Sequence, residues 1–547
     1  MKGSHLLLKC LKNQGVDTIF GYPGGSVIPL YDALYEDGTF NHIRTAHEQG
    51  ATHAADGYAR STGKPSVCIV TSGPGATNTI TGIATAYMDS TPMVVISGQV
   101  TRELLGKDSF QEVDITGMTF SITKHNFIVR DPSELPEIVS RAFFIATEGR
   151  PGPVLIDIPK DIFTSEVNEN INIDFSFNEK VKIACEEDIN RVIEAINNSK
   201  KPIIYAGGGV KKSGVSKLLT KLAEKIDSPV VSTVMGLGAI DRNHELSLGM
   251  VGMHGSLENN IAVSKCDLLI GIGARFSDRV IGDATKFATN ARVIHMDIDS
   301  SEISKNIPSA ISAVGCLNNT LEAVIDKAEK KSLNDWKKEI QSFKEEDKDS
   351  EEFHPVKIIE EFNKKFADAY VATDVGQHQM WTAQHFKFKF PNSFITSGGL
   401  GTMGFGLGAA IGAKVGNVDK DVLLVTGDGS FRMNCNEMFT IARYNIPIVI
   451  LLLNNSALGM VRQWQKMFFG ERYSQTDIDN YVDYVNFSKS FGVNSFRASN
   501  MDELKEILSD DSNFKGPVLI ECRIGKDENV LPIVPPGKPI ENPILNW

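Results

Sequence analysis

Two polar turns in the C-terminal third of the chain have residue types and a spacing that could hold a divalent cation. The triplet Gly427-Asp428-Gly429 follows the apolar run DVLLV, and Asn455 ends the next apolar run, 27 positions after the aspartate. A right-handed return through the intervening helix would place both turns on the same sheet edge. A carboxylate and an amide oxygen suit a hard cation such as Mg²⁺, and the two glycines would let backbone N–H groups approach a diphosphate. Taken alone, the triplet is equally compatible with two polar turns on an ordinary strand–helix–strand unit.

A second candidate for chemistry is Glu48, in the stretch RTAHEQGATHAADGYARSTGK. It follows a predicted strand and precedes a helix rich in small residues, where close packing is possible. Two glycines, Gly24 and Gly25, lie shortly before it in FGYPGGSVIPLYDAL. Considered by itself, a glutamate at the start of a helix is more often a solvated side chain, so its assignment depends on the rest of the chain.

The elements that must position these residues are short apolar runs that alternate with helical patterns and glycine-rich turns. Examples are PSVCIVTSGPGATN, PMVVISGQ, PVLIDIPKD, PIIYAGGG, DLLIGIGARFSD, ARVIHMDID, DVLLVTGDGS and IPIVILLLNN. Continuous apolar strands of this kind are typical of parallel sheets buried on both faces, and strand–helix alternation predicts α/β domains. Ligand sites in such sheets lie at the carboxyl ends of strands.

Two changes in composition predict domain boundaries. The stretch around residues 164–180 is polar, and the stretch around residues 330–355 is charged, with the pattern of a helix followed by a loop before Pro355. At ~100–200 residues per domain, a chain of 547 residues fits three domains. The predicted blocks are 1–165, 180–330 and 355–530, with a C-terminal tail at 531–547.

Composition excludes several classes of partner. The chain has 41% hydrophobic and 23% charged residues and a formal net charge of −12, and an acidic surface repels nucleic acid. No apolar stretch approaches the ~20 residues of a membrane span. The seven cysteines are dispersed without metal-site spacing, which indicates reduced thiols and a cytoplasmic location. The N-terminus reads as a helix leading into a strand, without the character of a targeting peptide.

A set of ordered motifs identifies a family. They are FGYPGG, HEQGA with AADGYAR, TSGPGATN, DSFQEVDITG, TKHNF, GRPGPVLIDIPKD, DVGQHQMW, SGGLGTMGFG, GDGSFRMN and NNSALGMVRQWQ. Over nearly the whole chain the sequence resembles the catalytic subunit of acetohydroxyacid synthase (acetolactate synthase), a family of thiamine-diphosphate (ThDP) enzymes. The resemblance implies three doubly wound parallel-sheet domains: a pyrimidine-binding (PYR) domain, a central FAD-binding domain and a diphosphate-binding (PP) domain.

The resemblance gives the two polar turns and Glu48 their roles. Mg²⁺ would bridge the diphosphate to Asp428, Asn455 and the carbonyl of Ala457. Glu48 would hydrogen-bond a nitrogen of the aminopyrimidine ring and promote the tautomer that deprotonates the thiazolium carbon. The other implied ThDP contacts are Gly25, Gln377, His378, Gly401, Met403 (the wedge that bends the cofactor), Gly427, Gly429, Ser430 and Met460.

Further residues are implied for substrate and flavin. The family's channel residues are matched here by Phe110, Gln111 and Lys160, and a wall of its acceptor pocket is matched by Trp464. Lys160 could equally be a surface lysine. Trp464 and the methionines could simply fill the core. The chain departs from the family's usual Gly-Asp at Gly315-Cys316, which puts one flavin contact in doubt. The implied FAD neighbours are Arg150, Gly208, Met253, His254, Gly273, Arg275, Asp278, Arg279 and Glu302.

The resemblance implies a transferase of branched-chain amino-acid biosynthesis. It would decarboxylate pyruvate and join the remaining two-carbon unit to pyruvate or 2-ketobutyrate, giving 2-acetolactate or 2-aceto-2-hydroxybutyrate. A homodimer or homotetramer with active sites at the dimer interface is implied, and the chain leaves no block for amino-acid sensing, so a separate small regulatory subunit is expected. The alternatives are a catabolic acetolactate synthase without FAD, another ThDP carboligase, decarboxylase or oxidase, and a non-catalytic nucleotide-binding subunit.

Overall fold

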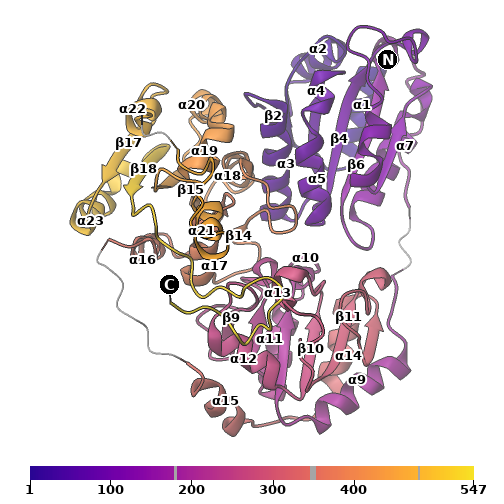
Figure 1. Ribbon diagram of the computed structural model, residues 1–547. Coiled ribbons are helices and arrows are strands. Elements are labelled where there is room, and N and C mark those ends of the chain that lie inside the picture. The colour runs from indigo at the N-terminus through magenta and orange to yellow at the C-terminus, as the bar shows by residue number, and fades with distance from the viewer. Residues whose placement is uncertain (178–180, 345–352, 479–480, 547) are drawn as a thin grey trace.

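Three six-stranded parallel sheets, each flanked by helices, organise the chain (Figure 1). The computed structural model describes residues 1–177, 181–344, 353–478 and 481–546. The predicted α/β class with three parallel sheets is therefore confirmed. No helix in these ranges is both long and apolar enough to cross a membrane.

The first sheet has the strand order β2-β1-β3-β4-β6-β5. Its apolar strands are buried, and the predicted N-terminal helix leads directly into its first strand. The elements are α1 (Gly3–Asn13), β1 (Thr18–Gly21), α2 (Ile28–Asp37), β2 (Asn41–Arg44), α3 (Glu48–Thr62), β3 (Ser66–Val70), α4 (Pro74–Thr77), α5 (Ile80–Met88), β4 (Met93–Gln99), α6 (Ile115–Thr119), β5 (His125–Ile128), α7 (Leu135–Thr147), β6 (Pro153–Pro159) and α8 (Lys160–Thr164).

The central sheet has the order β12-β11-β10-β7-β8-β9. Numbered from its own first strand, this is the 3-2-1-4-5-6 order of doubly wound dinucleotide-binding folds. The elements are α9 (Glu186–Asn198), β7 (Pro202–Ala206), α10 (Gly208–Lys212), α11 (Ser216–Ile226), β8 (Val230–Ser232), β9 (Ser247–Met250), α12 (Leu257–Lys265), β10 (Leu268–Ile272), α13 (Asp278–Ile281), β11 (Arg292–Asp297), β12 (Ile311–Val314), α14 (Leu317–Lys327) and α15 (Asn334–Gln341).

The third sheet, β14-β13-β15-β16-β18-β17, repeats the strand order of the first. This shared topology was not visible in the sequence. The elements are α16 (Pro355–Lys365), β13 (Tyr370–Thr373), α17 (Gln377–His385), β14 (Phe394–Ile395), α18 (Phe405–Gly416), β15 (Val422–Gly427), α19 (Asp428–Asn434), α20 (Met438–Tyr444), β16 (Val449–Asn454), α21 (Gly459–Phe468), α22 (Tyr484–Lys489), β17 (Asn494–Ala498), α23 (Met501–Ser509) and β18 (Val518–Arg523).

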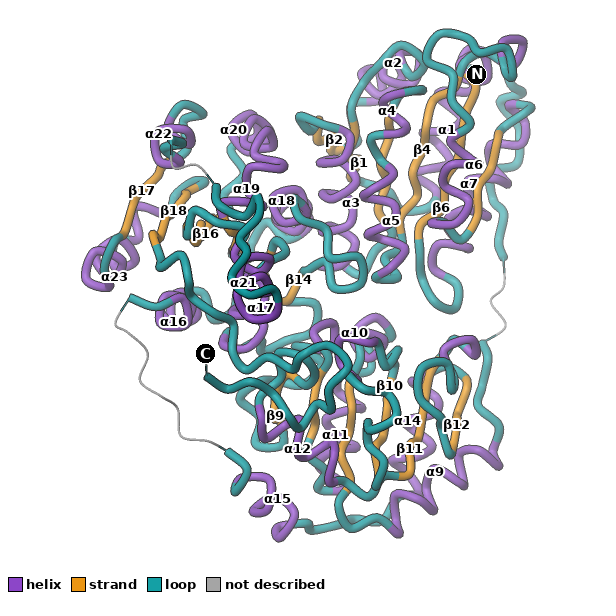
Figure 2. The backbone as a smooth tube through the Cα atoms, in the orientation of Figure 1, coloured by secondary structure: helices purple, strands orange, loops and turns teal. Residues whose placement is uncertain are grey.

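Helices α3 and α18 join the first and third sheets into one core, and lie side by side in Figures 1 and 2. Both are rich in Gly and Ala, which lets their backbones approach closely. A Cβ on Gly57 would lie 2.1 Å from the carbonyl oxygen of Ala409, and a Cβ on Gly412 would lie 1.7 Å from that of Ala54. The small-residue helix that follows Glu48 in the sequence therefore serves as a packing surface between domains.

The C-terminal tail crosses from the third sheet to the central one (Figure 2). The backbone N–H of Val534 donates to the carbonyl of Met253 at 2.8 Å, and that of Asp283 donates to the carbonyl of Lys538 at 3.1 Å. Ile540 is buried in the core beside the central sheet. The tail thus belongs, by its contacts, to the central sheet as much as to the third.

Candidate functional site

The two polar turns of the C-terminal third, at Asp428 and Asn455, lie together at the carboxyl edge of the third sheet. Strand β15 pairs in parallel with β16, with Gly427 opposite Leu453, so the residues that follow each strand meet. Asp428, Asn455 and Ala457 all line one cavity of about 60 Å³. This cavity, called the clamp cavity below, sits where the strand order reverses between β13 and β15, the position at which open α/β sheets bind ligands.

Asp428 enters this cavity as a buried carboxylate. Its side chain is 1% exposed, and its Oδ2 atom has no hydrogen-bond partner among the described residues. Burial raises the pKa of the Asp428 carboxyl to about 6, and a divalent cation beside it would favour the ionised form. Among the described residues, no group of three or more His, Cys, Asp or Glu side chains is arranged for a metal, so an ion here would depend on one carboxylate with amide and carbonyl oxygens.

Asn455 and Gln377 hold each other in place. The Asn455 amide donates to Gln377 Oε1 at 3.2 Å, while its own Oδ1 accepts from the N–H of Ala457 at 3.1 Å. The Gln377 amide nitrogen donates to Gln463 Oε1 at 3.0 Å. Gly459 leaves the room for this arrangement, because a Cβ there would lie 1.9 Å from Gln377 Oε1.

His378 supplies a second polar atom without a partner. Its ring is buried, and Nε2 has no hydrogen-bond partner among the described residues. Burial lowers the pKa of His378 to about 3, so the ring is neutral at neutral pH. It packs against Gly427, where a Cβ would lie 2.9 Å from Nδ1. A neutral imidazole can donate one N–H to an anionic ligand.

The remaining predicted ThDP contacts fall partly in this cavity. Met403, Gly427, Gly429, Ser430 and Met460 line it. Gly401 does not, but it precedes Met403 by two residues in the same loop and has a φ of +73°, which favours glycine. The end of this loop is held by Asp374, a residue that was missed in the sequence: its Oδ1 accepts from the N–H of Gly404 at 2.7 Å.

Glu48 lies elsewhere, at the first position of α3. Its Oε2 accepts from the Asn78 amide at 2.9 Å. The buried Glu437, also missed in the sequence, accepts from the backbone N–H groups of Ala46 and His47, each at 3.1 Å, and so holds the start of α3 from the third sheet. Glu48 is not among the residues that line the clamp cavity.

The predicted channel residues also belong to the first sheet. Gln111 has a φ of +60° and its backbone packs against Gly73, while Phe110 is 88% exposed. Lys160 begins α8 directly after β6 and is half-buried. Gly25 has open space where a Cβ would point. The predicted site residues therefore fall into two groups, one around Glu48 and one around Asp428.

Trp464 lies on α21, the helix that also carries Met460. Its ring is half-buried, 5.5 Å from that of Phe468 in an edge-on arrangement. The guanidinium of Arg279 lies 5.9 Å from the Trp464 ring centroid, which brings the central sheet next to this helix. Trp464 is thus not a fully enclosed core residue.

A larger cavity, of about 380 Å³, lies at the carboxyl ends of the central strands β7 and β10. This is the point where the 3-2-1-4-5-6 order reverses, at which doubly wound sheets bind dinucleotides. The turns after both strands approach closely: a Cβ on Gly207 would lie 2.1 Å from the carbonyl oxygen of Gly273. The cationic side chains Arg150, Lys212 and Arg275 line this central cavity.

The predicted flavin neighbours, except His254, line one or both of two cavities. Met253 and Asp278 line a smaller one of about 110 Å³, and Arg279 lines both. His254 is buried, its pKa lowered to about 4 by burial, and one ring nitrogen lies 3.2 Å from the carbonyl of Pro532 in the tail. The predicted neighbours that line the central cavity are Arg150, Gly208, Gly273, Arg275, Arg279 and Glu302, with Cys316 beside them.

Comparison with known proteins identifies the family. The N-terminal TPP binding domain of thiamine pyrophosphate enzymes matches residues 1–118, the central domain 189–324 and the C-terminal TPP binding domain 374–522. The chain is 45% identical to a probable acetolactate synthase large subunit of Methanocaldococcus jannaschii over 99% of this chain and 95% of that one. It is 44% identical to the acetolactate synthase isozyme 2 large subunit of Escherichia coli, covering 98% of each. The chain belongs to the acetolactate synthase large-subunit family.

Membership of this family makes the chain a ThDP-dependent enzyme, and the clamp cavity fits that cofactor's diphosphate. Asp428 Oδ2 and His378 Nε2 are two buried polar atoms in one cavity that have no hydrogen-bond partner within the described part of the chain, and buried polar groups ordinarily have one. Gly427 keeps the wall open where a side chain would collide with His378. A magnesium diphosphate would supply a cation for the carboxylate and acceptors for the imidazole.

Proposed function

We propose that the chain condenses two 2-keto acids with loss of carbon dioxide, forming 2-acetolactate from two pyruvates and 2-aceto-2-hydroxybutyrate from pyruvate and 2-ketobutyrate. The observation that carries the proposal is a pair of buried atoms, Asp428 Oδ2 and His378 Nε2, that no described residue hydrogen-bonds in the clamp cavity of an acetolactate synthase family member. The biosynthesis of branched-chain amino acids is the pathway these products serve.

The clamp cavity would hold Mg²⁺ and the diphosphate of ThDP. Asp428, the Asn455 amide oxygen and the Ala457 carbonyl are oxygen ligands of the kind Mg²⁺ prefers. His378 and Ser430 would face the diphosphate oxygens, and Gln377 keeps Asn455 oriented through their 3.2 Å hydrogen bond. ThDP, when bound, supplies the electron sink for decarboxylation. The apolar side chains of Met403 and Met460 would exclude water from the reacting centre.

Glu48 would hold and move a proton at the aminopyrimidine ring of ThDP. Glu48 does not line the clamp cavity of its own chain, and α3 is packed on α18 of the same chain. We therefore propose that Glu48 completes the clamp cavity of a second chain, with Gly25 beside it, in a homodimer or a dimer of dimers. Phe110, Gln111 and Lys160 would come with Glu48 and border the substrate channel, facing Trp464 of the other chain.

The central cavity is proposed to hold FAD. Its place at the strand-order reversal suits a dinucleotide, and Arg150, Lys212 and Arg275 offer cationic groups for a pyrophosphate. Met253, His254, Asp278 and Arg279 would form an outer extension near the tail. The reaction has no net redox change, so the role proposed for FAD is structural. This cavity favours the biosynthetic enzyme over a catabolic, flavin-free acetolactate synthase.

Two further assignments accompany this function. We propose a separate small regulatory subunit, because the curated relatives are named large subunits. A cytoplasmic location is proposed from the seven free cysteines, which suit a reducing compartment.

Product identification tests the function. The purified chain is incubated with pyruvate, with and without ThDP, Mg²⁺ and FAD, and the products are analysed. Acetolactate that requires ThDP and Mg²⁺ is expected, and a flavin absorbance spectrum separates the biosynthetic from the catabolic enzyme. Acetaldehyde, or no ThDP-dependent product, would contradict the proposal.

A further inference from the structure

Three consecutive residues at the end of α5, Met88 to Ser90, lie where all three domains meet at the wall of the central cavity. The carbonyl of Met88 accepts from Arg275 Nη1 at 2.7 Å. Ser90 accepts twice: its Oγ from Arg150 Nε at 2.8 Å, and its carbonyl from Lys212 Nζ at 3.0 Å. The three cationic side chains all line the central cavity. A ligand that binds them therefore acts on groups that also hold this turn.

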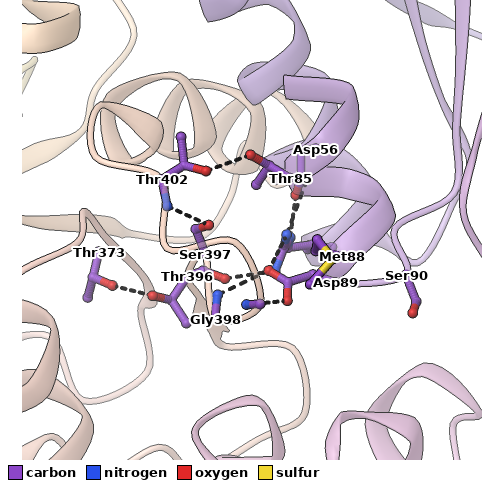
Figure 3. Close-up of polar contacts among 12 residues, drawn as sticks. Asp56, Thr85, Met88, Asp89, Ser90, Thr373, Thr396, Ser397, Gly398 and Thr402 are labelled. Atoms are coloured by element: carbon purple, nitrogen blue, oxygen red, sulfur yellow. Dashed lines mark hydrogen bonds and ion pairs between the residues drawn. The ribbon is translucent and has the colours of Figure 1, made fainter. Parts of the chain in front are cut away.

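Asp89 lies between Met88 and Ser90, and its side chain points toward the third sheet (Figure 3). Its carboxylate is fully buried and accepts from Gly398 N–H at 3.0 Å, from Gly399 N–H at 2.8 Å and from Arg60 Nη2 at 3.1 Å. Arg60 is itself paired with the buried Asp56. Charge-assisted hydrogen bonds of this kind are about twice as strong as neutral ones, so the loop at 398–399 cannot shift without losing them.

That loop leads into the clamp cavity. Its start is also held by the Thr396 carbonyl, which accepts from Arg60 Nη1 at 2.8 Å, and its middle by the Thr402 N–H, which donates to Ser397 Oγ at 3.0 Å. The next residue, Met403, lines the clamp cavity. Only four residues thus separate Gly398, in the wall of the central cavity, from Met403, the side chain expected to shape ThDP.

We propose that Asp89 is a positioning residue that couples the two cavities, so that FAD in the central cavity strengthens ThDP binding in the clamp cavity. FAD held by Arg150 and Arg275 fixes the turn at 88–90, and Asp89 passes this restraint to the loop that presents Gly401 and Met403. The coupling is reciprocal, because ThDP must strengthen FAD binding by the same factor. This inference rests on the cofactor assignments proposed above.

The test is a binding measurement on the full-length chain freed of both cofactors. ThDP is titrated calorimetrically in saturating Mg²⁺, with and without saturating FAD, and FAD is titrated with and without ThDP. For the wild type, each cofactor is expected to tighten the other roughly tenfold, within the usual range of such couplings. In Asp89→Asn both ratios should fall to within about twofold of one, while FAD still binds through the cationic side chains.

Two further variants make the result specific. Gly399→Ala disrupts the same contact from the loop side, since its Cβ would lie 2.7 Å from Asp89 Oδ1. This variant should also lose the coupling. It replaces Asp89→Asn in the test if Asp89→Asn does not fold. Thr85→Val is the matched control. It removes the 2.8 Å hydrogen bond between Thr85 and Thr402, which reaches the same loop without touching the central cavity, and it should keep the coupling.

The inference is overturned if the wild type shows independent binding, if both Asp89→Asn and Gly399→Ala keep the coupling, or if Thr85→Val loses it as well. Acetolactate formation by the wild type is measured alongside. Independent cofactor binding in an active wild type would refute the coupling and leave the proposed function standing. Failure to bind ThDP or to make acetolactate would refute the proposed function.

Discussion

Asp428 keeps a carboxylate oxygen in a cavity where no described residue forms a hydrogen bond with it, and such a group costs stability until a ligand binds it. The spacing of the two turns predicted that this residue and Asn455 meet at one sheet edge, because strand ends in parallel sheets meet there, and the family resemblance supplied their role. The sequence could not locate Asp374, Glu437 or Asp89. Their roles come from backbone N–H groups up to several hundred residues away, and nothing in their own neighbourhoods distinguishes them from solvated acids.

Asp428→Ala should strongly weaken ThDP binding without destabilising the cofactor-free protein. Among the described residues Asp428 is the only carboxylate lining the clamp cavity. Its loss should weaken ThDP binding in Mg²⁺ by ~100-fold or more, since Mg²⁺ depends on hard oxygen ligands. The melting temperature of the cofactor-free protein should stay equal or rise, because a buried unpaired carboxylate is gone. Calorimetric titration and thermal melting measure both. Asp511→Asn, on an exposed residue, is the control, and unchanged ThDP affinity in Asp428→Ala would refute the clamp.

Trp464→Leu should change acceptor choice more than overall turnover. The half-buried ring is proposed to contact the acceptor, and the two acceptors differ by one methylene, which an apolar wall discriminates by ~1–3 kcal/mol. The variant should therefore lower the preference for 2-ketobutyrate in a competition assay that reads the product ratio. Phe469→Leu, nearby and 53% exposed, should leave the ratio unchanged. An unaltered ratio with a general loss of stability would make Trp464 a packing residue only.

At the scale of elements, the pairing of α3 with α18 decides where the catalytic groups stand. The sequence predicted the strands that became β15 and β16 and the small-residue helix after Glu48. The helix that packs against it, α18, could not be predicted from the sequence, because the fit depends on Gly57 and Gly412 each facing a carbonyl from the other helix. The repeated strand order of the first and third sheets was hidden for a related reason: topology depends on which strands pair, and local pattern does not record that.

Gly412→Ala should destabilise this helix pair. Its Cβ would lie 1.7 Å from the Ala54 carbonyl oxygen, so the backbones must separate, at a cost of ~1–3 kcal/mol for overpacking. Urea unfolding of the cofactor-free protein measures the difference. Gly516→Ala is the matched control, since the nearest atom to its Cβ is 3.5 Å away. Equal stability of the two variants would mean that the helices are not tightly packed.

At the scale of the whole molecule, buried histidines tie stability to pH. Burial lowers the pKa of His53, on α3 beside Phe405, to about 3. Below the unfolded value near 6.5, the unfolded chain takes up a proton that the folded chain excludes, so acidification costs stability. Buried carboxyls act oppositely, since the pKa of Asp157 is raised to about 7 and that of Asp374 to about 6. The effect of His53 must therefore be measured as a difference.

His53→Gln should lose less stability than the wild type between pH 7 and pH 5. The difference should be ~2 kcal/mol, at 1.36 kcal/mol per pH unit below 6.5. Denaturant unfolding of both proteins at the two pH values gives it. Parallel pH dependence in the two proteins would show that His53 takes up its proton in the folded state.

The central claim is that acetolactate forms at a site built from Glu48 of one chain and Asp428 of another. The measurement is acetolactate formation by Glu48→Gln and Asp428→Ala proteins, separately and after the two are mixed and allowed to exchange subunits. Each alone should be nearly inactive. In a hybrid dimer one of the two sites recovers both native residues, so random exchange should restore about a quarter of wild-type activity. No recovery in the mixture, with hybrid dimers demonstrated and wild type active, would contradict the account.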